Sequence, residues 1–208
     1  MELPEYLFAR QDESNDEDFY SIPRFVTHID DATIDALTQY YREILKPEHE
    51  VLDLMSSWIS HLPVDESYRH VAGLGMNQEE LDRNPRLDDR QVHNLNSDPT
   101  MPFASESFDA VLIAVSVQYL TQPLQVFGEI ARVLRPEGHC IVGMSHRLFP
   151  TKAIYAFHSM NAADRVSLVS HYMQQTGVIK EVEFLDRSPP SADPLWIVHG
   201  RKSWTDTS

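Results

Sequence analysis

Runs of apolar residues alternate along the chain with segments whose apolar positions recur every three to four residues. The longest run, Phe108 to Val117, is nearly continuous and is typical of a strand covered on both faces. In the segment that follows, Val126, Phe127 and Ile130 fall on one helical face. The whole pattern predicts strands near 51–54, 69–75, 90–95, 108–117, 139–144, 180–185 and 195–201, and helices near 30–45, 122–134 and 163–175.

Strands that alternate with helices indicate βαβ crossovers, and therefore a mostly parallel sheet with helices on both faces. The expected class is α/β. A length of 208 residues suits one domain, which we place at residues 19–208. Residues 1–18 contain the stretch QDESNDED from Gln11 to Asp18, which has no apolar residue. Such a composition predicts a mobile acidic arm.

Charge and cysteine content narrow the function classes. Lys and Arg total 17 against 32 Asp and Glu, and the formal net charge is −15. This field repels phosphate backbones and anionic lipid headgroups, so we expect no nucleic-acid or membrane partner. No apolar run approaches the roughly 20 residues of a membrane span. The N-terminus lacks a secretory signal pattern, and the single cysteine, Cys140, cannot form an internal disulfide. A cytoplasmic location is the expectation.

In an open parallel sheet, ligands bind beyond the carboxyl ends of the strands. Here the residues at those ends are rich in Ser, Asn, Gln and His. The ten histidines show no pair spaced by three or four residues, so we expect no metal site. The chain also lacks the G-x-S-x-G, P-loop and G-x-G-x-x-G motifs, which disfavours hydrolase, nucleotide-triphosphatase and nicotinamide-dehydrogenase chemistry.

Two stretches resemble a known family. VLDL at 51–54 is followed by a turn, and PFASESFDAVLIAVSVQYLTQPLQVFGEIARVLRPEGHCIVG occupies 102–143. They look like the class I S-adenosylmethionine-dependent methyltransferases, and most like the group called methyltransferase type 11. The resemblance implies a Rossmann-like fold with seven strands, S-adenosylmethionine as cofactor, and methyl transfer to an acceptor that we expect to be a small molecule.

Three positions depart from the family pattern. The family's glycine-rich loop after the first strand is replaced by a glycine-free run from Met55 to Ile59. Gly75 stands where the second strand usually ends in an acid, and Asn94 stands where an Asp often follows the third strand. The alternative is therefore a catalytically inactive relative that serves as a cofactor sensor or protein-binding module. An open turn at residues 55–58 would favour the enzyme, and a side chain of Met55 or Trp58 filling the cofactor space would favour the alternative.

The resemblance implies a set of cofactor-binding residues, each with a structural alternative. Ser56 and Ser57 are expected to bind the methionine carboxylate at a helix N-terminus, or only to cap that helix. Asn77 is a candidate for the ribose, and Asn94 and Asn96 for adenine, although Asn is also common in turns. The full set is Arg24, Asp53, Leu54, Met55, Ser56, Ser57, Gly75, Met76, Asn77, Asn94, Leu95, Asn96 and Val115.

Two members of this set carry alternatives of their own. Asp53 ends the first strand, where it would either face the methionine amine or brace the loop. Arg24 lies in the leading segment, which often covers the cofactor in this fold. Its guanidinium matches a carboxylate, although a surface ion pair is the ordinary role of a single Arg.

For the chemistry itself, His146 and Tyr119 are the candidate catalytic residues. Both follow strands whose carboxyl ends should face the transferred methyl group. An imidazole titrates near neutral pH and suits a general base. The alternative for His146 is a histidine on a loop that is simply solvated.

Overall fold

The structure, a computed structural model, describes residues 3–204. Its centre is a seven-stranded sheet in the order β3-β2-β1-β4-β5-β7-β6, in which β7 runs antiparallel to both neighbours and the other pairs are parallel. This confirms the expected α/β class. The strands are β1 Glu50–Ser56, β2 His70–Gly75, β3 Asp89–Val92, β4 Phe108–Ala114, β5 Leu134–Met144, β6 Ile179–Asp186 and β7 Trp196–Lys202.

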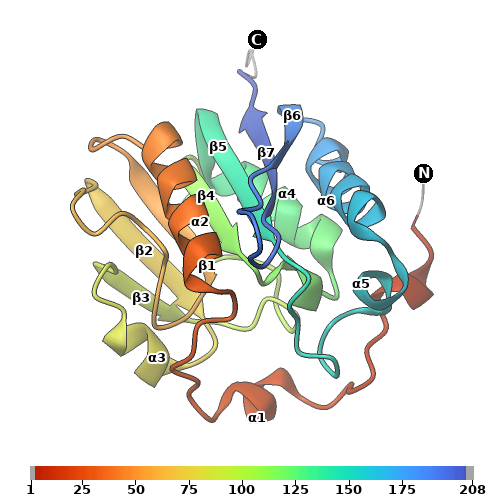
Figure 1. Cartoon of the computed structure of the whole chain (residues 1–208). Coiled ribbons are helices and arrows are strands. Elements are labelled where there is room, and N and C mark those ends of the chain that lie inside the picture. Colours follow the sequence, from red (N-terminus) through yellow and green to blue (C-terminus); the bar gives the residue numbers. More distant parts are fainter. Residues whose placement is uncertain (1–2, 205–208) are drawn as a thin grey trace.

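Helices cover both faces of the sheet (Figure 1). One face packs against α2, whose Leu37, Tyr40 and Tyr41 are buried, and the other packs against α4 and α6. The helices are η1 Glu5–Phe8, α1 Asp16–Tyr20, α2 Asp31–Ile44, α3 Gln78–Arg83, η2 Val117–Tyr119, α4 Pro123–Val133, α5 Tyr155–Ser159 and α6 Ala162–Gln175. None of the helices between residues 3 and 204 is long and apolar enough to cross a membrane.

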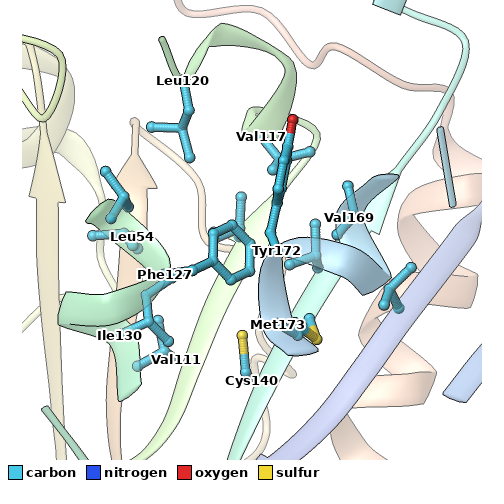
Figure 2. Packing of buried hydrophobic residues seen from close by; sticks show 14 of the residues in the cluster. Leu54, Val111, Val117, Leu120, Phe127, Ile130, Cys140, Val169, Tyr172 and Met173 are labelled. Carbon is cyan, nitrogen blue, oxygen red and sulfur yellow. The ribbon is translucent and has the colours of Figure 1, made fainter. Parts of the chain in front are cut away.

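Aromatic packing joins α4 and α6 on the second face. Figure 2 shows the rings of Phe127 and Tyr172 side by side, with centroids 5.5 Å apart. Val117 and Leu120, which follow β4, belong to the same buried cluster. The loop that leaves the carboxyl end of β4 is therefore anchored in the core, and the polar side chains on it are held in place.

The N-terminal segment differs from the expected mobile acidic arm. Residues 3–18 pack on the body, where Arg10 pairs with Ile154 in an isolated bridge and Asp12 N donates to Thr151 O at 2.9 Å. The ammonium of Lys152, which is fully buried, contacts Ser14 O at 2.7 Å and Asp16 Oδ1 at 3.2 Å. The prediction considered only apolar burial, whereas this segment is ordered by ion pairs with a buried lysine.

The connection between β1 and β2 also differs from expectation. Residues 57–69 run as a loop, and no helix follows β1 in this described stretch. The prediction that Ser56 and Ser57 lie at a helix N-terminus, as ligand donors or as caps, is therefore wrong. The hydroxyls of both serines bind side chains instead, as shown below.

Candidate functional site

A cavity of about 1120 Å³, open to solvent, lies at the carboxyl ends of β1, β2 and β4. We call it the main cavity. One side of the cavity consists of residues at the carboxyl ends of β1, β2 and β4 and of residues that follow β1, β2, β3 and β4. We call this side the strand wall. The other side, the N-terminal wall, consists of Asp16, Tyr20, Arg24, Val26 and His28. In Figure 1 the N-terminal segment crosses below the sheet from α5 to the side of α3.

Most of the residues predicted from the sequence do meet around this cavity. Apart from Arg24 of the leading segment, they come from the ends of four different strands, as the rule for open parallel sheets requires. The predicted residues that line it are Arg24, Asp53, Met55, Ser56, Ser57, Gly75, Met76, Asn94, Leu95, Asn96, Val115 and Tyr119.

Three predicted residues lie elsewhere. Leu54 is fully buried in the apolar core because its side chain points to the opposite face of β1 from Asp53. Asn77 caps α3, and its amide donates to Tyr20 O at 2.9 Å, so it does not line the main cavity. His146 is exposed after β5, where its Nε2 lies 3.2 Å from Asp193 Oδ1.

A bulge in β1 explains how the chain dispenses with a glycine-rich loop. Leu54 pairs with Leu74, but Ser56 pairs with Gly75, so Met55 is an extra residue, with φ of 59°. A Cβ on residue 75 would lie 2.2 Å from Ser56 O. The glycine that permits close backbone approach is therefore on β2 rather than in the loop, and this packing excludes an acidic side chain at position 75.

The two serines bind carboxylates. Ser56 Oγ donates to Asp53 Oδ2 at 2.5 Å, and Ser57 Oγ donates to Glu80 Oε2 at 2.7 Å. Burial raises the pKa of Asp53 to about 6, against the lowering effect of its hydroxyl partners. Asp53 thus braces the end of β1 through Ser56, which is one of its two expected roles.

Glu80 is a site residue that sequence reasoning missed. Its carboxylate is buried, lines the main cavity, and accepts from Arg24 N at 2.6 Å as well as from Ser57. The pattern Asn77-x-x-Glu80 resembles a capping box, and Asn77 Oδ1 does accept from Glu80 N. In a capping box the Glu would bind the cap residue, whereas here it turns to the cavity and supplies the acid that Gly75 lacks.

Arg24 lines the cavity, but its guanidinium donates hydrogen bonds to backbone oxygens of its own segment. Its guanidinium donates to Phe19 O at 2.9 Å and Ile22 O at 3.1 Å, and lies 4.4 Å from the centre of the Phe19 ring. Trp58 does not line the main cavity, because its indole donates to Val26 O at 3.1 Å. Of the two side chains that could have filled the cofactor space, only Met55 faces the cavity.

The two asparagines after β3 make different hydrogen bonds. Asn94 Oδ1 accepts from Asn96 N at 3.0 Å, which is the turn geometry given as its alternative. Asn96 donates to Asp16 Oδ2 at 2.8 Å and to Tyr119 O at 2.9 Å. Asn96 thus joins the strand wall to the N-terminal wall.

His61 is a second residue that sequence reasoning missed. Its side chain is 7% exposed and lines the main cavity, and its φ is 55°. Burial lowers its pKa to about 4, so the imidazole is neutral at pH 7. Within residues 3–204, its Nδ1 and the hydroxyl of Ser116, another lining residue, are buried without hydrogen-bond partners. No motif marks His61, because its position depends on the unusual loop after β1.

Comparison with solved structures agrees with the sheet order. The chain is similar to the [4+2]-cyclase SpnF, with 15% identity and a TM-score of 0.62. The match covers 82% of each chain. It is also similar to phosphoethanolamine N-methyltransferase 2 of Haemonchus contortus, solved with S-adenosyl-L-methionine, with 14% identity and a TM-score of 0.61. That match covers 82% of this chain and 52% of the other. An S-adenosylmethionine-dependent methyltransferase of Mesorhizobium loti is 15% identical with a TM-score of 0.57, and the match covers 81% of this chain and 100% of that one.

A family model described as a methyltransferase domain matches residues 56–142, from the end of β1 into β5. The chain has the fold of the class I S-adenosylmethionine-dependent methyltransferases, and the part that matches the methyltransferase domain is less than half of its length. Among curated proteins, it is 33% identical over 69 residues to the demethylmenaquinone methyltransferase of Renibacterium salmoninarum. That alignment spans 32% of this chain and 29% of the relative, less than a third of its length.

The lining of the main cavity fits S-adenosylmethionine. Asp53 and Glu80 bring two carboxylates to the cavity that form no ion pair within residues 3–204, whereas the third lining carboxylate, Asp16, is paired with Arg10 and Lys152. Such a lining favours a ligand with positive charge, and S-adenosylmethionine carries a sulfonium. The unpartnered Nδ1 of His61 and hydroxyl of Ser116 are further groups that a polar ligand can satisfy.

Proposed function

We propose that the chain binds S-adenosylmethionine in the main cavity and transfers its methyl group to a small molecule. The observation that carries this proposal is the convergence, at the carboxyl ends of β1, β2 and β4, of an open cavity, an acidic lining and buried unpartnered polar atoms. The glycine-free loop, which gave the inactive alternative its support, places Trp58 outside this cavity and Met55 in the lining of a cavity that stays open.

The residues present suggest a division of the cavity among the parts of the cofactor. Leu95 and Asn96 are proposed to face adenine, with the turn at Asn94 holding them. Glu80 is proposed to accept the ribose hydroxyls in place of an acid at the end of β2. The residues around the β1 bulge, Met55 to Ser57, together with His61, are proposed to hold the amino-acid end.

The bound cofactor supplies an electrophilic methyl group on sulfur, so the protein needs mainly to orient the reactants and exclude water. The N-terminal wall is proposed to exclude water, because it closes one side of the cavity with aromatic and charged side chains. Tyr119 keeps its proton, since burial raises its pKa and outweighs the lowering effect of the hydrogen bond that its hydroxyl oxygen accepts from Phe149 N at 2.8 Å. We therefore propose Tyr119 as part of the pocket wall rather than as a base.

The acceptor is proposed to be a small molecule. The net charge of −15 disfavours a nucleic-acid substrate. A second cavity adjoins the first and shares His28, Val115, Tyr119 and Phe149 with it, which leaves room for a ligand beside the cofactor.

Glu80→Gln tests the placement of the cofactor. Isothermal titration with S-adenosylhomocysteine should show affinity at least tenfold below wild type, because a charge-assisted hydrogen bond to a ribose hydroxyl becomes a neutral one. Glu79→Gln is the matched control, since Glu79 is exposed and pairs with Arg83. Equal affinity in the two variants would show that Glu80 does not contact the cofactor.

Transfer itself is tested with S-adenosylmethionine that carries a trideuterated methyl group. Incubated with a mixture of small metabolites, the wild type should yield labelled products detectable by mass spectrometry, and Ser57→Trp should yield none because the indole would occupy the cavity. If the wild type binds S-adenosylhomocysteine and labels no acceptor, the sensor alternative replaces the enzyme.

A further inference from the structure

The second cavity, which we call the outer cavity, has a volume of about 490 Å³ including its open mouth. It shares four lining residues with the main cavity: His28, Val115, Tyr119 and Phe149. Val115 has a φ of 46°, an unusual conformation for a β-branched residue, and it stands directly after β4. The two cavities therefore meet at one set of side chains, which is the arrangement that transfer between two ligands requires.

Arg147 brings positive charge to the outer cavity. Its Nε donates to both carboxylate oxygens of Asp193 at 3.0 Å, which leaves the terminal amino groups of this half-exposed side chain to face a ligand. Asp193 is buried, and its Oδ2 also accepts from Asp30 N at 3.2 Å. The guanidinium is thus fixed at its inner end by a carboxylate that belongs to the frame of the protein.

Three aromatic rings contribute to the outer cavity, beside Thr27, Val115 and Leu148. Tyr119 and Phe149 stack with centroids 5.7 Å apart and an interplanar angle of 28°. His28 meets Phe149 edge-on, with centroids 5.2 Å apart. Since His28 lines both cavities, its imidazole lies where a methyl group would pass from one ligand to the other. Desolvation lowers its pKa, which favours the neutral form that can accept a proton.

We propose that the outer cavity binds the methyl acceptor, and that the acceptor is an aromatic acid with a ring hydroxyl. Its ring packs on Tyr119 and Phe149, its carboxylate binds Arg147, and its hydroxyl faces His28. Guanidinium and carboxylate pair with matching geometry, and stacked rings favour a planar ligand. The inference rests on the proposed function, because the hydroxyl needs a methyl donor in the main cavity.

The reaction balances with these groups alone. The phenolic O–H bond breaks and its proton passes to the imidazole of His28. The oxygen forms a bond to the methyl carbon while the carbon–sulfur bond breaks, and its electron pair stays on sulfur. The products are a methyl ether and S-adenosylhomocysteine, and the imidazolium returns its proton to water.

The test uses protein saturated with S-adenosylhomocysteine, so that acceptor binding is measured apart from cofactor binding. The probes are 4-hydroxybenzoate, 3,4-dihydroxybenzoate and 4-hydroxycinnamate, each titrated beside its neutral counterpart, phenol, catechol or 4-vinylphenol. We expect at least one acid to bind about tenfold or more tightly than its counterpart. Arg147→Ala should abolish that preference. Arg69→Ala should retain it, because Arg69 is exposed at the opposite, amino end of β2.

His28→Gln should leave the affinity for the preferred acid within a few-fold and lower the rate of its methylation about 100-fold or more. If S-adenosylhomocysteine binds but no acid is preferred over its neutral counterpart, this inference is overturned while the proposed function stands. Retention of the preference by Arg147→Ala would overturn the inference in the same way. If S-adenosylhomocysteine does not bind at all, the proposed function fails and the inference fails with it.

Discussion

The strand wall and the N-terminal wall of the main cavity are built by different forces. The strand wall consists of residues at the ends of strands whose interiors are fully apolar, such as Leu52, Leu74 and Val111. The N-terminal wall belongs to an acidic segment that is held by Arg10 and Lys152 through Asp16. Hydrophobic burial positions the first wall and charge pairing positions the second. One wall can therefore be disturbed without the other.

This difference bears on the proposed function. The strand wall is part of the cooperative core, so it should open only with global unfolding. The N-terminal wall makes fewer apolar contacts and depends on ion pairs, so it should open at lower free energy. A ligand entering the main cavity would pass on that side.

The largest effect is expected for Lys152→Met, which breaks the N-terminal wall. The variant leaves Asp16, buried beside Arg10, without its second cation, and breaking a buried ion pair costs about 3–5 kcal/mol. Urea denaturation should report this loss, and hydrogen exchange should rise over residues 9–24 while β1 and β4 stay protected. Lys46→Met, at an exposed position, is the control. Uniform loss of protection would show that the two walls are not separable.

Asp53→Asn tests how a buried carboxyl group of the strand wall affects stability at different pH values. Burial raises the pKa of Asp53 to about 6 in the folded state, so the folded protein retains this proton where the unfolded chain, with a value of 3.8, releases it. The stability contributed by this group is present below pH 3.8 and is lost as the pH rises through 6. The variant should match wild type near pH 4 and exceed it by about 3 kcal/mol at pH 8.

The histidines with lowered pKa values, His28, His49, His61, His139 and His199, act in the opposite direction. They destabilise the fold as the pH falls below about 6.5. These histidines are present in both wild type and Asp53→Asn. Their contribution therefore cancels when the free energy of unfolding of one protein is subtracted from that of the other. Denaturation midpoints measured at several pH values check the prediction, and a difference independent of pH would contradict it.

A smaller effect is expected for Gly75→Ala, which disturbs the strand wall alone. The added Cβ meets Ser56 O at 2.2 Å, so the β1 bulge must shift at a cost of about 1–3 kcal/mol. Gly128→Ala is the matched control, since nothing lies within 4 Å of its Cβ and it sits inside α4. That control should stabilise the protein by about 0.5–1 kcal/mol. Equal stability of the two variants would contradict the bulge as the reason for Gly75.

The sequence predicted the strands and the edge of the sheet that holds the site, because apolar periodicity and strand order depend on burial. For the same reason most of the residues that it proposed for the cofactor line the main cavity, and their binding roles stay predictions. It missed Glu80 because the residue looks like half of a capping box, and it missed His61 because a positive φ leaves no mark in the sequence. It misread the N-terminal segment because a buried lysine more than 130 residues away orders it.

Thermal unfolding of the wild type with and without S-adenosylhomocysteine tests the central claim, that the main cavity is a cofactor site without a glycine-rich loop. At 100 times the dissociation constant, binding should stabilise the fold by about 2.7 kcal/mol, a rise in melting temperature of roughly 5–10 °C. Ser57→Trp should melt at the same temperature with and without the ligand. An unchanged melting temperature for the wild type at millimolar ligand would contradict the account.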